Sequence, residues 1–343
     1  MPSALTSAAA RSLAVCLCLL AATVPAASET SWGSWAEEVQ KQHPLAGSTY
    51  IPLERGGRLL RFLHLTGNDV GIGLGIVLLG EVHDNPHHHR LRKWLIESPF
   101  DPDRRPAIVM EHVRANQQPA LDRFKALADA GGGSADELFG LLEWDKSGWP
   151  PAQIFKPLFE AIVAARSPIY PGDPPRDQVR AIARGGLGAL AAEEKTRLEL
   201  DAPLPGPLAD ALDRELLASH CGALPPQAIP GMALAQRYRD AHQAAALIAA
   251  AARHGSAILI AGNGHVRSDR GVPWHIRRRQ PDARVTSVLL LEVEEGKTDP
   301  AAYVPRDPEG KPAADTIIFT PRAERGDPCE GLRKKGSDPS PPR

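Results

Sequence analysis

The sequence predicts an α/β protein with a mainly parallel central sheet flanked by helices and a helical insertion over the carboxyl end of that sheet. Short apolar runs at 76–82, 107–113 and 257–261 are rich in branched residues and predict strands buried on both faces. Helical stretches separate these runs, and strands that alternate with helices are typical of a parallel sheet. Because such sheets bind ligands outside the carboxyl ends of their strands, polar residues at those ends are the first candidates for a functional site.

The remaining elements follow from capping signals and breakers. Asn85 before Pro86 is typical of a helix start, and we expect that helix to run to about Glu97. Ser134 can cap a short helix that follows the one expected at 117–130. We also expect helices at 155–165 and 232–254, and strands at 168–170, 284–293 and 316–320.

The amino-terminal residues resemble an export signal. Arg11 is the only charge before Glu29, and the apolar run from Leu13 to Val24 has the length of a signal core. We therefore expect an exported protein of the periplasm or cell envelope. The expected organisation is a signal peptide at 1–26, a leader segment at 27–47, one domain at 48–322 with the helical insertion at about 115–250, and a partly disordered tail at 323–343.

A lipid anchor is not expected, because the two cysteines of the signal, Cys16 and Cys18, follow Val15 and Leu17 rather than small residues. After signal removal, no other stretch is long and apolar enough to span a membrane. The chain has 40 basic and 41 acidic residues, a balance that gives no electrostatic footprint for nucleic acid.

Two cysteines remain in the mature chain, Cys221 and Cys329. In an oxidising compartment they could form one disulfide that ties the carboxyl-terminal tail to the middle of the chain. Two unpaired thiols are the alternative, since the sequence cannot show that their Cα atoms come within bridging distance.

Acidic and histidine residues follow the predicted strands. Glu81 and His83 are two residues apart, so an extended chain places both side chains on one face. Glu111 ends the next strand and is a stronger candidate than His112, because Val109 and Val113 share its face. His265 follows a third strand in the turn 262–265, where glycines allow the backbone to turn close to a ligand.

Other polar runs are weaker candidates. Adjacent histidines at 87–89 resemble a metal-binding tract, but helical neighbours point about 100° apart and cannot converge on one ion. We interpret them as solvated first-turn residues, with His87 the one that could face the site. Asp240, next to Arg239 on the long helix, either points into the site or forms a surface pair.

A series of segments in a fixed order carries these polar residues: 78–85, 110–112, 219–222, 235–241, 261–267, 271–273 and 320–322. The series resembles the ChaN-like haem-binding uptake family of the Tiki superfamily, over roughly residues 48–330. The resemblance implies an α/β fold, haem as cofactor, and a cell-envelope role in iron or haem uptake. It also implies a pocket that draws on Glu81, His83, Glu111, Asp240 and His265.

Within this interpretation, His83 or His265 would ligate the haem iron, and Tyr170 and Tyr238 are candidates for a tyrosinate ligand. Family members often carry a tyrosine near Phe155 and are often lipoproteins, so this chain departs from the pattern in both respects. Candidate partners besides haem are a second copy of the chain and an outer-membrane haem receptor.

Two other functions use the same residues. The wider superfamily includes proposed metallopeptidases and resembles erythromycin esterases, which implies a hydrolase in which Glu81 or Glu111 is the base and His83 or His265 an acid or orienter. A divalent ion could instead bind among Glu81, His83 and His265. The third function is a non-catalytic envelope protein that binds a partner. Whether the chain is an enzyme stays open.

Overall fold

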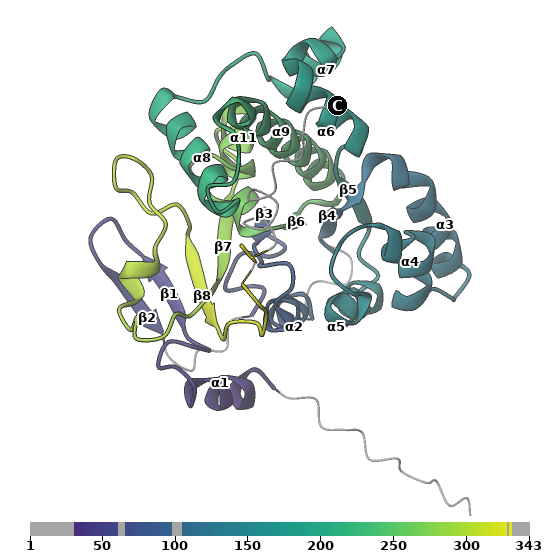
Figure 1. The fold of residues 1–343 in the computed structure, drawn as a ribbon. Coiled ribbons are helices and arrows are strands. Elements are labelled where there is room, and N and C mark those ends of the chain that lie inside the picture. Colours follow the sequence, from purple (N-terminus) through teal and green to yellow (C-terminus); the bar gives the residue numbers. More distant parts are fainter. Residues whose placement is uncertain (1–30, 61–65, 98–104, 328, 331–343) are drawn as a thin grey trace, which may run out of the picture. The chain divides into compact units, whose positions relative to one another are not determined.

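The computed structural model describes residues 31–60, 66–97, 105–327 and 329–330, and these contain one eight-stranded sheet. The strand order is β2 (Gly57–Leu60), β1 (Thr49–Pro52), β8 (Thr316–Thr320), β7 (Val285–Glu292), β3 (Ile76–Leu79), β6 (Ala257–Ile260), β4 (Ala107–Arg114) and β5 (Ile169–Asp173). Figure 1 shows β1 and β2 at one edge and β4 and β5 at the other.

The sheet is mixed, which corrects the expectation of a mainly parallel one. The strands from β8 to β5 pair in parallel, as predicted, but β1 pairs antiparallel with both β8 and β2. β1 and β2 have four residues each and carry no long apolar run, so the sequence did not mark them. The predicted helical range 115–250 contributes β5 to the sheet, so a separate insertion over the strand ends stays a prediction.

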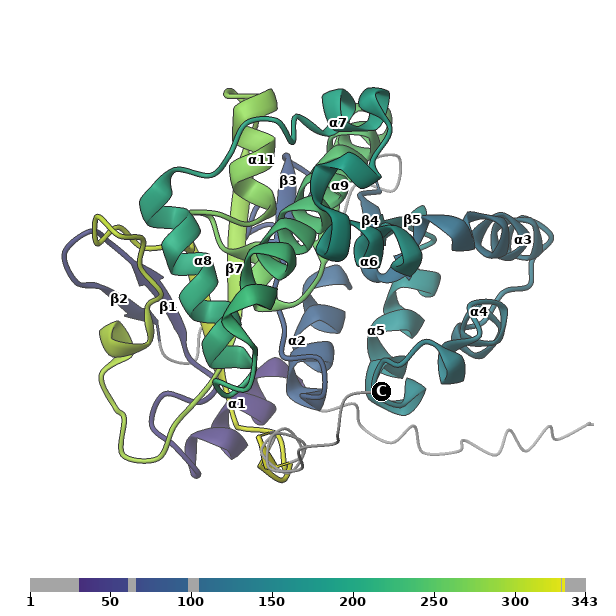
Figure 2. The same cartoon turned by 45° about the horizontal axis from the view of Figure 1, so that its top comes forward.

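Helices cover both faces of the sheet. On one face, Val77 and Leu79 of β3 pack in a core with α1 (Trp32–Gln40), α2 (Pro86–Ile96), α3 (Gln118–Asp129), α4 (Ala135–Leu141) and α5 (Ala152–Ala164). On the other face, Ile76 and Leu78 pack in a core with α9 (Ile229–His254), α10 (Asn263–Val266) and α11 (Val272–Arg279). Figures 1 and 2 show α2 and α9 on opposite sides of the strands. The continuous apolar runs are explained, since both faces of each central strand are buried.

Most elements confirm the sequence-based predictions to within a few residues. Asn85 caps α2, and Ser134 caps α4 with the reciprocal bonds of a capping box. The predicted helix at 232–254 begins slightly earlier, at Ile229. Three helices join α5 to α9 through the proline-rich middle of the chain: α6 (Arg176–Gly185), α7 (Ala192–Leu198) and α8 (Gly206–Ser219).

The carboxyl-terminal segment is fastened to the rest of the fold. The guanidinium of Arg325 bonds both Asp84, in the loop after β3, and Glu292, at the end of β7. Cys221 and Cys329 are disulfide-bonded, with Cα atoms 5.7 Å apart, so the first of the two alternatives for these cysteines holds in the structure. The expected signal peptide at 1–26 and the end of the tail from residue 331 lie outside the described residues.

Among the described residues, no helix has the length and apolar character needed to cross a membrane.

Asn85 links the start of α2 to β7 and to the carboxyl-terminal segment. Its Oδ1 accepts from the His87 amide at 2.9 Å, and its Nδ2 donates to Glu292 Oε1 at 2.7 Å and to the Pro321 carbonyl at 2.9 Å. We expect Asn85→Ala to lower the free energy of unfolding by about 2 kcal/mol, because it removes a cap and leaves buried groups unpaired. Urea denaturation beside Ser134→Ala, which removes a solvent-exposed helix cap, measures this. An equal loss in the two variants would contradict a linking role for Asn85.

Candidate functional site

The first half of the site is built around the carboxylate of Glu81, which follows β3 and is buried. Its Oε1 contacts His83 Nδ1 at 2.5 Å and His112 Nε2, at the end of β4, at 2.9 Å. Its Oε2 forms an ion pair with Arg92 of α2, whose side chain is fully buried. One carboxylate therefore joins two strand ends to a helix.

The charges around Glu81 keep it ionised. Burial acts to raise the pKa of Glu81, but the Arg92 guanidinium and His112 outweigh it and hold the pKa well below its usual range. Burial likewise acts to lower the pKa of His83, and the Glu111 and Glu81 carboxylates raise it. The result is an imidazole that donates from Nδ1 to a fixed anion.

His88 and His89 are buried, which corrects their interpretation as solvated residues. His88 Nδ1 accepts from the Val82 amide at 2.8 Å, and its Nε2 contacts Thr320 Oγ1 at 2.8 Å. His89 Nε2 contacts the carbonyl of His83 at 2.9 Å. Both rings hold the loop that carries Glu81 and His83, so their role is to position the site. His87 is half-buried and accepts from Trp35 Nε1 at 3.1 Å.

The second half of the site is built around Glu111 and His265. Glu111 Oε2 accepts from the Gly262 amide at 2.7 Å, and its Oε1 accepts from Arg239 Nη2 at 2.7 Å. His265 lies between two carboxylates: its Nδ1 is 2.5 Å from Asp240 Oδ1 and its Nε2 is 3.3 Å from Glu111 Oε1. Asp240 is buried and points into the site, which decides between the two alternatives for this residue.

His265 carries a charge in this setting. Burial acts to lower the pKa of His265, but Glu111 and Asp240 raise it to about 9, against a small opposing effect of Arg239. Because the folded pKa lies above the ordinary 6.5, the stabilisation is fully present below pH 6.5 and is lost as the pH rises through about 9.

We therefore expect the free energy of unfolding to fall on the order of 2 kcal/mol between pH 6.5 and 9 through this group. Urea denaturation across that range, with the disulfide intact, measures the slope. His265→Gln should be less stable at pH 6.5 and should lose most of the slope. A slope that is the same in His265→Gln and the unmodified protein would contradict this assignment.

The two halves meet at Gly262. A Cβ atom at this position would lie 3.1 Å from His83 Cε1 and Nε2 and 3.6 Å from Glu111 Oε2. The glycine at the end of β6 thus lets the His83 ring approach the backbone. Five predicted residues, Glu81, His83, Glu111, Asp240 and His265, lie in one group, which we call the strand-end cluster.

The two candidate tyrosines lie outside the strand-end cluster. Tyr238 is buried and donates to Gln178 Oε1 at 2.8 Å, and burial raises the pKa of Tyr238 to about 12, which disfavours a phenolate. Tyr170 lies near the amino end of β5 and contacts His254 Nε2 at 2.8 Å. Phe155 packs against the rings of His89 and His112, so its position borders the cluster from α5.

Sequence reasoning missed two cluster partners, Arg92 and Arg239, and ranked a third, His112, below Glu111. Arg92 and Arg239 lie on helices and carry the countercharges of Glu81 and Glu111. The available signal was the need of a buried carboxylate for a partner. For Glu111 that partner is Arg239, which directly precedes Asp240, a residue that the sequence analysis had already considered.

His83 is the member of the cluster that a ligand can reach. Its side chain is 36% exposed, against 5% for His265. The Trp149 ring lies 4.8 Å from the His83 ring, and its Nε1 donates to the His112 carbonyl at 3.1 Å. An exposed imidazole beside an indole can ligate a metal at Nε2 while an apolar group packs against the indole.

A divalent ion fits the cluster less well. Glu81, His83 and His112 offer ligand atoms within 4.8 Å of one another, so His112 rather than His265 completes this group. However, Glu81 Oε1 already accepts two imidazole N–H groups, and Arg92 neutralises the same carboxylate. Both hydrogen bonds and the ion pair would have to be replaced.

Comparisons with known proteins show the family and the fold of this chain. A model of the family described as "Haem-binding uptake, Tiki superfamily, ChaN" matches residues 73–276. Among solved structures, ChaN of Campylobacter jejuni, described with cofacial haem, has a TM-score of 0.55 at 19% identity, over 79% of this chain and 96% of that chain. This likeness shows a shared fold. No curated protein matches the chain.

Two further solved structures are more distant, and their TM-scores are too low to support an argument. The type III effector HopBA1 has a TM-score of 0.35 at 14% identity, over 73% of this chain and 88% of that chain. An erythromycin esterase mutant, EreC, in its open conformation has a TM-score of 0.35 at 12% identity, over 76% of this chain and 93% of that chain.

Proposed function

Because this chain belongs to the haem-binding uptake family of the Tiki superfamily, ChaN, we propose that it is an exported haem-binding protein of the cell envelope, linked to iron or haem uptake. We assign His83 as the residue that would ligate the haem iron. The supporting observation is the 2.5 Å contact between His83 Nδ1 and the buried carboxylate of Glu81.

A hydrogen bond of this kind usually accompanies metal ligation by histidine. Such a residue almost always donates its other ring N–H to a carboxylate or carbonyl, which fixes the tautomer and raises the basicity of the ligating nitrogen. Here Glu81 receives Nδ1–H, so Nε2 is the free nitrogen, and no described residue hydrogen-bonds to it. Haem, when bound, would supply the Lewis-acidic iron that this nitrogen ligates.

The other cluster members are less suited to ligation. Both nitrogens of His265 face carboxylates and its side chain is only 5% exposed, so neither nitrogen is free for a ligand. Glu111 is committed to Arg239 and Gly262. These residues instead hold the Gly262 turn against the His83 ring and so fix its orientation.

Export is supported by two features that are independent of the site. The amino terminus has the charge, apolar core and small residues of a signal peptide. The Cys221–Cys329 disulfide is typical of an oxidising compartment.

The direct test is a titration of the purified mature protein with hemin, followed by the Soret band. We expect a shifted band that saturates at a fixed stoichiometry, together with size-exclusion data that report whether two copies share haem. A spectrum that stays the sum of free hemin and protein at all ratios would overturn the proposal.

Hydrolysis is a second candidate, favoured by one observation. Asp240 orients His265 at Nδ1, and His265 Nε2 faces the ionised Glu111, an arrangement of orienter, imidazole and carboxylate that can move a proton. A panel of esters and peptides, assayed with and without a chelator, tests it. Turnover that is lost in Glu111→Gln would support this function, and no turnover by the unmodified protein would exclude it for that panel.

A further inference from the structure

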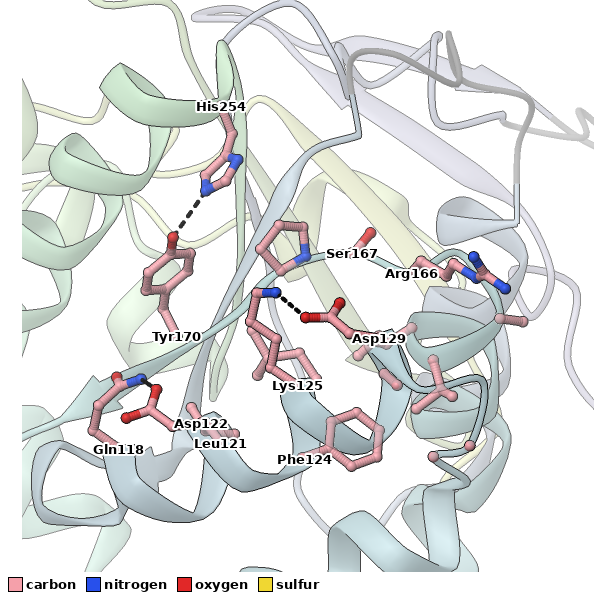
Figure 3. A pocket seen from close by; sticks show the side chains of 18 of the residues that line it. Gln118, Leu121, Asp122, Phe124, Lys125, Asp129, Arg166, Ser167, Tyr170 and His254 are labelled. Carbon is pink, nitrogen blue, oxygen red and sulfur yellow. Dashed lines mark hydrogen bonds and ion pairs between the residues drawn. The ribbon is translucent and has the colours of Figure 1, made fainter.

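A hollow of about 880 Å³ lies away from the strand-end cluster, between α3, the end of α5, the start of β5 and the end of α9 (Figure 3). His254, at its edge, is fourteen residues along α9 from Asp240, or about 21 Å of helix. Tyr170 pairs with Val109, early in β4, whereas Glu111 lies further along that strand. The hollow is therefore separate from the proposed haem site.

One wall of the hollow is apolar. Leu121 and Phe124 of α3 and Ile162 of α5 line it and are buried within the fold. Figure 3 shows the Phe124 and Leu121 side chains along one side of the space and Tyr170 on another. A volume of this size is within the range of small-molecule sites, which are lined mainly by apolar groups and oriented by a few polar ones.

The polar groups of the hollow include the hydroxyl of Tyr170, which a hydrogen bond holds in place. Tyr170 Oη lies 2.8 Å from His254 Nε2. Burial and the neighbouring Arg253 lower the pKa of His254, so the ring is neutral and can accept a hydrogen bond from the Tyr170 hydroxyl. The oxygen of Tyr170 keeps lone pairs that can accept from a hydrogen-bond donor on a ligand.

The charges that line the hollow leave two guanidiniums without a countercharge. Lys125 pairs with Asp129 at 2.5 Å, and Asp122 accepts from Gln118 Nε2 at 2.8 Å. Arg166 and Arg253 also line the space, and neither forms an ion pair with any residue that the structure describes. In addition, Arg166 has a φ of 50°, a backbone conformation that non-glycine residues rarely adopt.

We propose that this hollow is a second ligand site, which binds an apolar molecule that carries a carboxylate. The apolar wall packs against the body of the ligand, and a guanidinium pairs with the carboxylate through two parallel hydrogen bonds. A long-chain fatty acid has this chemistry. The inference does not rest on ligation by His83.

The experiment uses the full mature protein with its disulfide intact. Binding of oleate and of oleyl alcohol is measured by calorimetry, with oleate below its micelle-forming concentration. The test variants are Arg166→Gln, Arg253→Gln and Tyr170→Phe, and all three should fold because the two arginines are exposed and Tyr170 loses only a hydroxyl. Arg180→Gln, an exposed arginine on α6, is the matched control, and His83→Ala reports on the haem site.

We expect one carboxylate-bearing ligand to bind saturably and to lose about tenfold or more of its affinity in an arginine variant, but not in Arg180→Gln or His83→Ala. An oleate affinity that falls in Arg166→Gln or Arg253→Gln identifies a fatty acid as the ligand. Binding of oleyl alcohol as tight as that of oleate, or no ligand whose affinity depends on Arg166 or Arg253, would overturn the inference.

Discussion

Glu81→Leu is expected to lower the free energy of unfolding by about 3–5 kcal/mol, because it strands the charge of Arg92 in the interior. The Arg92 side chain is fully buried, and its Nε and Nη1 have no hydrogen-bond partner among the described residues. The ion pair with Glu81 is therefore its main compensation. Two imidazoles, those of His83 and His112, lose their acceptor in the same variant.

Urea denaturation at pH 7 measures this loss, and a double variant separates charge from packing. Glu81→Leu with Arg92→Met replaces the pair by apolar groups, so it should be more stable than Glu81→Leu alone. Glu38→Ala is the control, because Glu38 forms an ion pair with Lys41 in which both side chains are highly exposed, and little change is expected there. A double variant less stable than Glu81→Leu would contradict the stranded-charge explanation.

His83→Ala is expected to weaken hemin binding by about 100-fold, because the iron loses its protein ligand and the site loses its exposed imidazole. Hemin titration of the variant beside the unmodified protein measures the change. Fold stability should be nearly unaffected, since His83 is partly exposed, and circular dichroism checks that the variant is folded.

His87→Ala is the matched control for this prediction. His87 lies four residues further along the chain, is half-buried, and bonds Trp35 rather than the cluster. It should bind hemin like the unmodified protein. Equal hemin affinities of His83→Ala and His87→Ala would show that His83 is not the ligand. The ligand would then lie elsewhere in the chain, and Tyr170 would be the next residue to test.

The strands and their ends could be predicted because their signals are local. The apolar runs before Glu81 and Glu111 have the continuous apolar composition of strands that are buried on both faces. Parallel pairing then brings the carboxyl ends of these strands together. Asn85 before Pro86 carries its own capping chemistry. Those local signals were enough to place Glu81, Glu111 and His265 at one edge of the sheet, whereas Asp240 entered the predicted pocket through the family resemblance.

The partners of these residues could not be predicted in the same way. Arg92 and Arg239 reach Glu81 and Glu111 from helices that pack on opposite faces of the sheet, and no local pattern marks them. Likewise, His88 and His89 have polar neighbours in sequence, and their burial results from contacts with Thr320 and the loop at His83. Tertiary contacts decide such positions, whereas helical periodicity alone suggested solvent exposure.

The most direct test of the central claim is the resonance Raman spectrum of the reduced haem complex. If His83 ligates the iron, the unmodified protein should show an iron–histidine stretching band that is absent from His83→Ala and unchanged in His87→Ala and Tyr170→Phe. A band that persists in His83→Ala, or a phenolate-ligated ferric spectrum that is lost in Tyr170→Phe, would contradict the assignment.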